Sequence, residues 1–150
     1  MTKTDADNQQ LMHATAVAIA GKGLMICGKS GAGKSDLALR LIDRGAILIS
    51  DDYVDIRRTE GRLLLYPPAS LAGKLEVRSL GIVERDYISG IALDLIVDLK
   101  ENPDRFPLDE QTMILLGITV PVCTLDAMES SAAIKAEIAL QRSSQTALRE

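Results

Sequence analysis

A glycine-rich run in the first third of the chain has the residue types of a phosphate-binding loop. Residues 28–35 match the pattern GxxxxGK[ST]. Glycines allow backbone conformations that turn N–H groups toward phosphate oxygens. Lys34 would place a positive charge near the β- and γ-phosphates, and the Ser35 hydroxyl could ligate Mg²⁺. The alternative is a structural glycine-rich turn. The run predicts a nucleotide-binding site formed by Gly28, Lys29, Ser30, Gly31, Ala32, Gly33, Lys34 and Ser35.

Two adjacent carboxylates, Asp51 and Asp52, follow a short apolar run at residues 46–49. Ligands bind at this end of the strands in open α/β sheets. Because adjacent strand residues point to opposite faces, the two carboxylates would do different jobs. One could help to hold Mg²⁺, directly or through water, and the other could accept a proton from an attacking hydroxyl. This placement favours a kinase-like variant of the phosphate-loop proteins. The alternative is an aspartate pair that begins a turn.

Three further polar residues could do chemistry, but their spacing alone favours simpler roles. His13 lies in an alternating segment, where a lone histidine is typical of a core or edge position. Glu76 and Arg78 would share one face of an extended segment, as a metal-binding carboxylate beside a phosphate-stabilising guanidinium. The simpler interpretation of that pair is a surface ion pair.

These residues require a strand before the glycine-rich run and a helix after it. Residues 24–27 are apolar, and the apolar stripe over 34–44 is typical of a helix with one buried face. We expect 13–19 and 24–27 to form an antiparallel hairpin, and 53–58 and 62–66 to form another. Further expected elements are strands at 46–49, 81–83 and 91–99, one or two strands at 113–125, and a helix from Asp126 to about Arg142, whereas 71–79 is ambiguous.

Hairpins combined with a single strand–helix–strand unit predict an α/β fold with a mixed sheet. We expect residues 1–10 to be a disordered tail and residues 11–150 to form one phosphate-loop catalytic domain. In the strand at 91–99, Asp94 and Asp98 occupy the face opposite the apolar one. We expect a solvated face there rather than a metal-binding pair.

The amino-acid composition limits the kinds of molecule that the protein is expected to bind. The 150 residues carry a formal net charge of −4, and aromatic residues make up 3% with no Trp, so neither a polyanion-binding surface nor a base-stacking platform is expected. Two Cys and one His are too few for a structural zinc site. The chain contains no apolar run of membrane-spanning length and no signal-peptide pattern, so we expect a cytoplasmic protein without nucleic-acid or membrane partners.

The ordered set of motifs resembles the catalytic C-terminal domain of the HPr kinase/phosphorylase family, over roughly residues 11–125. The matching residues are His13, the glycine-rich run at 28–35, Arg44-Gly45, Ser50-Asp51-Asp52, Pro67-Pro68, the segment LEVRSLGIV at 75–83, and Thr119-Val120-Pro121-Val122. The resemblance implies a nucleotide-binding core similar to that of phosphoenolpyruvate carboxykinase. It also implies ATP-dependent phosphorylation of a serine of the phosphocarrier HPr, and removal of that phosphate by phosphorolysis.

The resemblance also assigns roles to individual residues. Asp52 would be the base that deprotonates the substrate serine, and Lys34 would bridge the phosphates. Ser35 and Glu76 would ligate Mg²⁺, beside Asp51. The resemblance further implies that His13 belongs to the active site, and that Arg78 lies in a stretch tied to catalysis in both directions.

The chain departs from the long forms of this family in three ways. We expect a short form without their N-terminal domain and with reduced C-terminal helices, and residues 123–126 contain no arginine where the long forms place a catalytic one. We therefore expect weak phosphorylase activity, and a homo-oligomer is a possibility. One alternative function is a small-molecule kinase of the shikimate or gluconate type, although the stretch 102–107 offers only Arg105 for an arginine-rich lid. Another alternative is a nucleotide-dependent switch without phosphotransfer.

Overall fold

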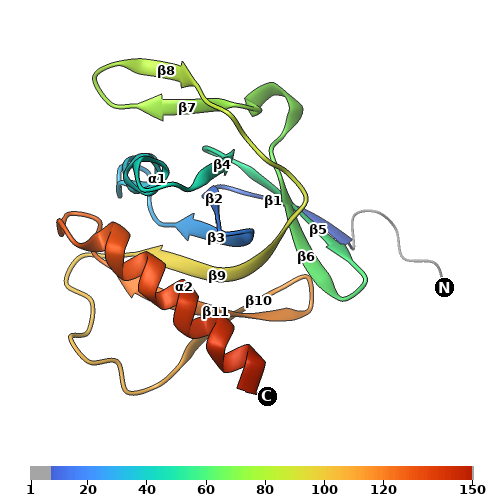
Figure 1. Ribbon diagram of the computed structural model, residues 1–150, viewed down its shortest axis with the longest axis vertical. Helices are drawn as coiled ribbons and strands as arrows, with labels where there is room; N and C mark the ends of the chain where they lie inside the picture. The colour runs from blue at the N-terminus through green and yellow to red at the C-terminus, as the bar shows by residue number, and fades with distance from the viewer. Residues whose placement is uncertain (1–7, 150) are drawn as a thin grey trace.

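The computed structural model describes residues 8–149, with side chains described as far as residue 143. Two α-helices, α1 (Lys34–Asp43) and α2 (Ala132–Arg149), and a short 3₁₀ helix, η2 (Ala69–Leu71), accompany a strand-rich chain (Figure 1). The strands are β1 (Gln9–Met12), β2 (Thr15–Ile19), β3 (Lys22–Cys27), β4 (Ile47–Ser50), β5 (Val54–Thr59), β6 (Arg62–Tyr66), β7 (Lys74–Val77), β8 (Gly81–Glu84), β9 (Ile91–Leu99), β10 (Gln111–Leu115) and β11 (Ile118–Leu125). Within residues 8–149, no helix combines the length and apolar character needed to cross a membrane.

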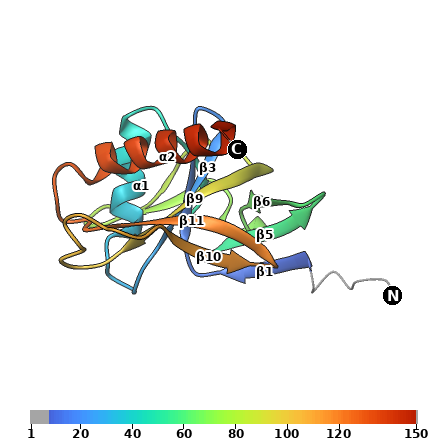
Figure 2. The same cartoon turned by 90° about the horizontal axis from the view of Figure 1, so that it is seen from below.

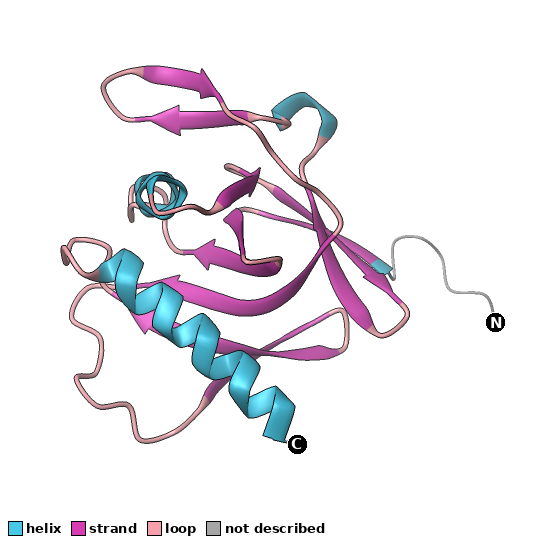
Figure 3. Cartoon of the chain, viewed as in Figure 1, coloured by secondary structure: helices cyan, strands magenta, loops and turns pink. Residues whose placement is uncertain are grey.

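Most of the strands form one mixed sheet, in the order β1-β5-β6-β9-β3-β2-β4. Strand β9 is central to the sheet because it pairs with three other strands. The first residues of β9 pair with β6, the middle residues pair in parallel with β3, and the last residues pair in parallel with β11. Strand β10 extends the sheet beyond β11, and the strands curl around one another (Figure 3). These pairings confirm the predicted α/β class with a mixed sheet.

Both helices cover the same face of the sheet (Figure 2). The expected apolar stripe of α1 is buried there, because Leu37, Ala38 and Leu41 are fully inaccessible and pack with Leu24 and Ile26 of β3. The opposite face has a second apolar cluster, closed by the β5–β6 and β10–β11 hairpins. Burial on both sides makes β3 a rigid support for the loop that follows it.

Local sequence patterns predicted several elements correctly. The hairpins β2–β3 and β5–β6 form as expected, and the helix expected at 34–44 is α1. The strand expected at 91–99 is β9, and the segment 113–125 resolves into β10 and β11. The ambiguous segment 71–79 contains η2 and β7, and β7 pairs with β8 in a separate hairpin above α1.

Three expectations at the ends and edges were wrong. The tail expected at 1–10 ends earlier, because Gln9–Met12 pairs with β5 as an edge strand; residues 1–7 lie outside the described residues. The last helix begins at Ala132 instead of Asp126, since Asp126 instead closes a turn by accepting the Met128 N–H at 2.9 Å. The solvated face expected on β9 does not form, because the pairing with β3 shifts register at Asp94: Leu93 packs in the second cluster and Leu95 in the first, and both carboxylates are only partly exposed.

Candidate active site

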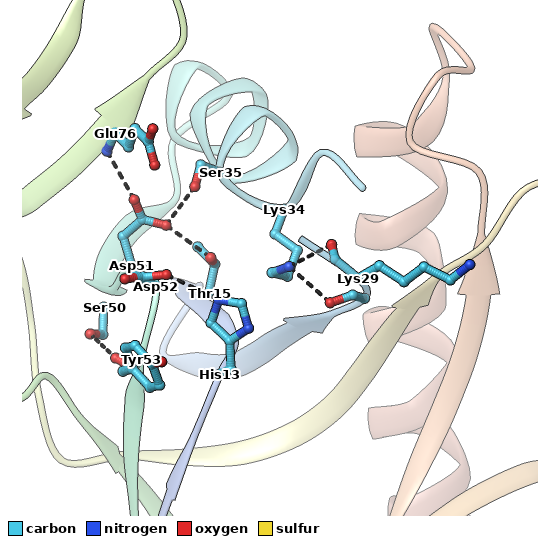
Figure 4. Close-up of polar contacts among 11 residues, drawn as sticks. His13, Thr15, Lys29, Lys34, Ser35, Ser50, Asp51, Asp52, Tyr53 and Glu76 are labelled. Carbon is cyan, nitrogen blue, oxygen red and sulfur yellow. Dashed lines mark hydrogen bonds and ion pairs between the residues drawn. The ribbon is translucent and has the colours of Figure 1, made fainter. Parts of the chain in front are cut away.

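The predicted site residues come from four elements that meet at one end of the sheet (Figure 4). The phosphate-binding loop connects β3 to α1 and places Lys34 and Ser35 in the first helical turn. Asp51 and Asp52 follow β4 directly, and Glu76 lies in β7. His13 precedes β2, which lies between β3 and β4. The sheet order therefore brings together residues that are far apart in the chain.

The glycine-rich loop has the geometry of an anion site. Gly31 has φ +83°, and Gly33, the N-cap of α1, has φ +100°, a region that disfavours any residue with a Cβ. A Cβ on Gly33 would also lie 3.1 Å from the Cβ of Ala127. No side chain caps this helix end, so the first N–H groups of α1 lack protein partners. Those N–H groups and the helix dipole together favour bound phosphate.

Lys34 is folded back over this loop. Its side chain is only 7% exposed, and its Nζ donates to the carbonyl oxygens of Gly28 and Lys29, both at 2.8 Å. An ammonium group has three protons, so a third donor remains for a phosphate oxygen. The Lys29 side chain extends away from the loop and is exposed (Figure 4).

Asp51 is a buried carboxylate that joins three elements. It is 4% exposed. Its Oδ1 accepts hydrogen bonds from the hydroxyls of Ser35 at 2.7 Å and Thr15 at 2.9 Å, and its Oδ2 accepts the backbone N–H of Glu76 at 2.9 Å. The donors come from α1, β2 and β7. One carboxylate thus ties the phosphate-binding loop to the β7–β8 hairpin.

Asp52 lies in a different environment from its neighbour. It has φ +71° in a tight turn closed by the Tyr53 N–H and the Asp51 carbonyl oxygen at 2.8 Å, a conformation that Asp and Asn adopt more readily than most residues. Its side chain is 57% exposed, and its Oδ1 lies 3.0 Å from Nε2 of His13. The Tyr53 ring packs beside His13, with centroids 5.1 Å apart. An exposed, oriented carboxylate of this kind can accept a proton from an incoming group.

Glu76 and Arg78 differ in how closely they approach the cluster. Glu76 is exposed, and its carboxylate makes no hydrogen bond or ion pair within the described residues, while its backbone binds Asp51. Arg78 is exposed in the turn after β7, and within residues 8–149 it makes no hydrogen bond or ion pair. The two side chains do not form the surface ion pair that their spacing favoured.

Two residues beside the predicted site were missed from the sequence: Thr15, which binds Asp51, and Tyr53, which packs on His13. Thr15 follows His13 by two positions, so strand alternation placed both on one face and could have indicated it. Just before the loop, burial and the nearby charge of Asp98 raise the pKa of the Cys27 thiol to about 11, which disfavours the thiolate form that a nucleophile needs.

Comparison with known protein families identifies the family to which the chain belongs. A model of the HPr Serine kinase C-terminal domain matches residues 5–146. The chain belongs to this family. The resemblance inferred from the motifs is thereby confirmed.

HPr kinase/phosphorylases from several bacteria align along most of the chain. The HPr kinase/phosphorylase of Clostridium botulinum (strain Eklund 17B) is 38% identical over 126 residues, which cover 76% of this chain and 41% of the relative. That of Caldicellulosiruptor bescii is 32% identical, over 75% of this chain and 40% of the relative. The chain therefore spans about two fifths of the length of these relatives.

A solved structure of similar size has the same fold. The Hpr(Ser) kinase/phosphatase from Coxiella burnetii superimposes with a TM-score of 0.79 and 27% sequence identity. The match covers 94% of this chain and 99% of the Coxiella chain.

Proposed function

We propose that this protein is an ATP-dependent serine kinase whose substrate is an HPr-type phosphocarrier protein. The observation that supports this most directly is the Asp52 carboxylate, exposed beside His13 at the sheet end that also holds the phosphate-binding loop. A serine hydroxyl has a very high pKa, so transfer of a phosphoryl group to its oxygen needs a positioned acceptor for the hydroxyl proton. The family relationship favours a protein serine over a small-molecule acceptor, and it favours catalysis over a passive nucleotide switch.

The phosphates of ATP would lie on the N-terminus of α1. The free N–H groups of the loop and the third proton of Lys34 would contact the phosphate oxygens. The other two protons of the ammonium would stay on the carbonyl oxygens of Gly28 and Lys29. Arg78, free in its turn, would add a second positive charge at the transferred group.

The donor set fits Mg²⁺ bound together with ATP. No three His, Cys, Asp or Glu side chains within the described residues gather to hold a metal alone, which agrees with a hard cation that takes its other ligands from phosphates and water. Ser35 and the unpaired carboxylate of Glu76 would be its protein ligands, and Asp51 would act beside it through Ser35 or through water. Bound Mg²⁺ would neutralise charge on the β- and γ-phosphates.

Asp52 would then take the proton of the substrate serine as its oxygen attacks the γ-phosphorus. His13 would hold that carboxylate in place through the contact at 3.0 Å, with Tyr53 supporting the imidazole. The exposure of Asp52 leaves room for a protein loop to bring its serine to this oxygen. We further propose that the protein works in the cytoplasm, where it meets its phosphocarrier, and that it forms a homo-oligomer.

The test is incubation with Mg-ATP and purified HPr, with the intact mass of HPr as readout. We expect a mass increase of one phosphoryl group on a serine, and none with Lys34→Ala, a variant that should keep the fold while losing the phosphate contact. ATP turnover without a phosphorylated protein product would favour a small-molecule acceptor. Binding of ATP without turnover would support the nucleotide switch.

A further inference from the structure

Thr15 of β2 donates to the same Asp51 oxygen as Ser35, and it is completely inaccessible to solvent. Its neighbours Ala14 and Ala16 pack in the apolar cluster on the opposite face of the sheet, so Thr15 faces the side of Ser35 and Asp51. A buried hydroxyl destabilises the fold unless it is hydrogen-bonded. The one bond that satisfies Thr15 is its donation to Oδ1 of Asp51 at 2.9 Å. A valine of the same shape would fill this place without needing a partner, so the hydroxyl has a use.

The bond from Thr15 limits how the Asp51 carboxylate can turn. A carboxylate oxygen accepts about two hydrogen bonds. Oδ1 already has two, from Thr15 and Ser35, and Oδ2 faces the backbone N–H of Glu76. Thr15 lies on a central strand paired on both sides, by β3 and β4, so its hydroxyl is a fixed point. The other two donors belong to the residues proposed to hold Mg²⁺.

We propose that Thr15 is a positioning residue for the metal ligands of this site. This inference rests on the proposed function. With Thr15 on Oδ1, the carboxylate is held so that Oδ1 accepts the proton of Ser35 and Oδ2 fixes the backbone of Glu76. The Ser35 hydroxyl has a single proton, and donation of that proton to Asp51 leaves its oxygen lone pairs directed at the cation. Thr15 thereby presets both ligands without touching substrate or metal.

Removal of the hydroxyl should loosen both ligands at once. Asp51 would keep two donors, from α1 and β7, and the buried charge would lose its partner on the central strand β2. The carboxylate could then rotate, and the Ser35 proton could point into the metal position. Metal affinity should therefore fall, while the phosphate contacts of the loop backbone should be unaffected.

The test compares Thr15→Val, which removes the hydroxyl at constant shape, with Thr15→Ser, which keeps it. Mn²⁺ serves as the probe, and its binding in the presence of ADP is measured by electron paramagnetic resonance, independently of activity. We expect Thr15→Val to weaken Mn²⁺ binding about tenfold, the order expected for loss of a hydrogen bond to a charged group. Metal-free ADP affinity should be unchanged, and Thr15→Ser should bind Mn²⁺ within about twofold of wild type.

Val17→Ala is the matched control, since Val17 is equally buried on the same strand and packs only in the apolar cluster. It should lower the thermal midpoint without changing Mn²⁺ affinity. If Thr15→Val does not fold, Thr15→Ala removes the same donor. Unchanged Mn²⁺ binding in either folded variant, or a folded Thr15→Ser that binds as weakly as Thr15→Val, overturns the inference. Failure of wild type to phosphorylate HPr while the Mn²⁺ pattern holds would contradict the proposed function alone.

Discussion

His13 and Asp52 are 39 positions apart in the chain, yet Nε2 of the histidine lies 3.0 Å from Oδ1 of the aspartate. The contact exists because β2 and β4 are neighbours in the sheet, and each residue lies just outside its strand at the same edge. Both side chains are about half exposed, so the pair is open to solvent. Asp52 is accordingly the residue whose replacement tests the chemistry most directly.

Asp52→Asn should abolish phosphotransfer to HPr and retain binding of Mg-ATP. Asn has nearly the same shape and tolerates the positive φ of this position, but its amide cannot take up the serine proton. Loss of a general base typically lowers the rate about 10²- to 10⁴-fold. Single-turnover transfer to HPr and ATP titration together provide the measurement.

Asp51→Asn is the matched comparison for that variant. It should weaken binding of ATP with Mg²⁺, because the amide keeps one acceptor oxygen in place of two, so either the Ser35 and Thr15 hydroxyls or the Glu76 N–H would lose its acceptor. Normal transfer by Asp52→Asn together with loss in Asp51→Asn would reverse the two roles. Normal transfer by both variants would show that neither carboxylate is the base.

Glu76→Gln should reduce the response to Mg²⁺ more than it reduces metal-free nucleotide binding. The substitution removes a charged oxygen ligand, which hard cations need, but leaves intact the backbone N–H that binds Asp51. The measurement is activity and ATP affinity as a function of Mg²⁺ concentration. Glu84→Gln is the control, since Glu84 is an exposed glutamate on the partner strand of the same hairpin. Identical Mg²⁺ curves for Glu76→Gln and wild type would remove Glu76 from the metal site.

The kinase direction should dominate over phosphorolysis. Attack of inorganic phosphate on a serine phosphate brings two anionic groups together and needs positive charge to screen them. Residues 123–126, at the end of β11, contain no arginine. The measurement follows release of phosphate from serine-phosphorylated HPr with excess inorganic phosphate. Efficient release accompanied by pyrophosphate would mean that an arginine elsewhere in the chain, or in a neighbouring subunit, provides this screening.

Asp94→Asn should raise the thermal midpoint at neutral pH. Burial raises the pKa of the Asp94 carboxyl, against the opposing charges of Lys22 and Arg62. The native state therefore holds this proton more tightly than the unfolded state, and stability falls as pH rises through the range between the two pKa values. The gain from Asn should be full above the folded pKa and vanish below about pH 4. Asp104→Asn, in an exposed loop, should show no such pH-dependent gain, and an equal gain at acid pH would contradict the assignment.

Local patterns in the sequence predicted the parts of the site that depend on neighbouring residues. The phosphate-binding loop, the helix behind it and the aspartates after β4 depend on short-range spacing, so they could be identified directly. The contact between Thr15 and Asp51 could not be predicted from local spacing, because it requires β2 to lie between β3 and β4. The hydrogen bond from the Glu76 backbone to Asp51, which joins residues 25 positions apart, could not be predicted from local spacing either.

The errors also have physical causes. Strand β1 is largely exposed and lies at the sheet edge, where backbone pairing with β5 needs no buried side chains, so Gln9 and Gln10 carry no strand signal. Asp126 and Glu129 have the spacing of a helix start, but the turn they form is not continued until Ala132. On β9, the register shift at Asp94 breaks the alternation from which the solvated face was predicted.

Strand β9 lies between β6 and β3 in the sheet, although it follows both in the chain. During synthesis the glycine-rich loop therefore leaves the ribosome while its supporting strand still lacks one neighbour. The β2–β3 hairpin is only marginally stable until a further strand and the helix pack on it. Nucleotide binding should thus begin only once residues 91–99 have emerged from the ribosome. A nascent chain cut before β9 would carry the complete phosphate-binding motif and still bind no ATP.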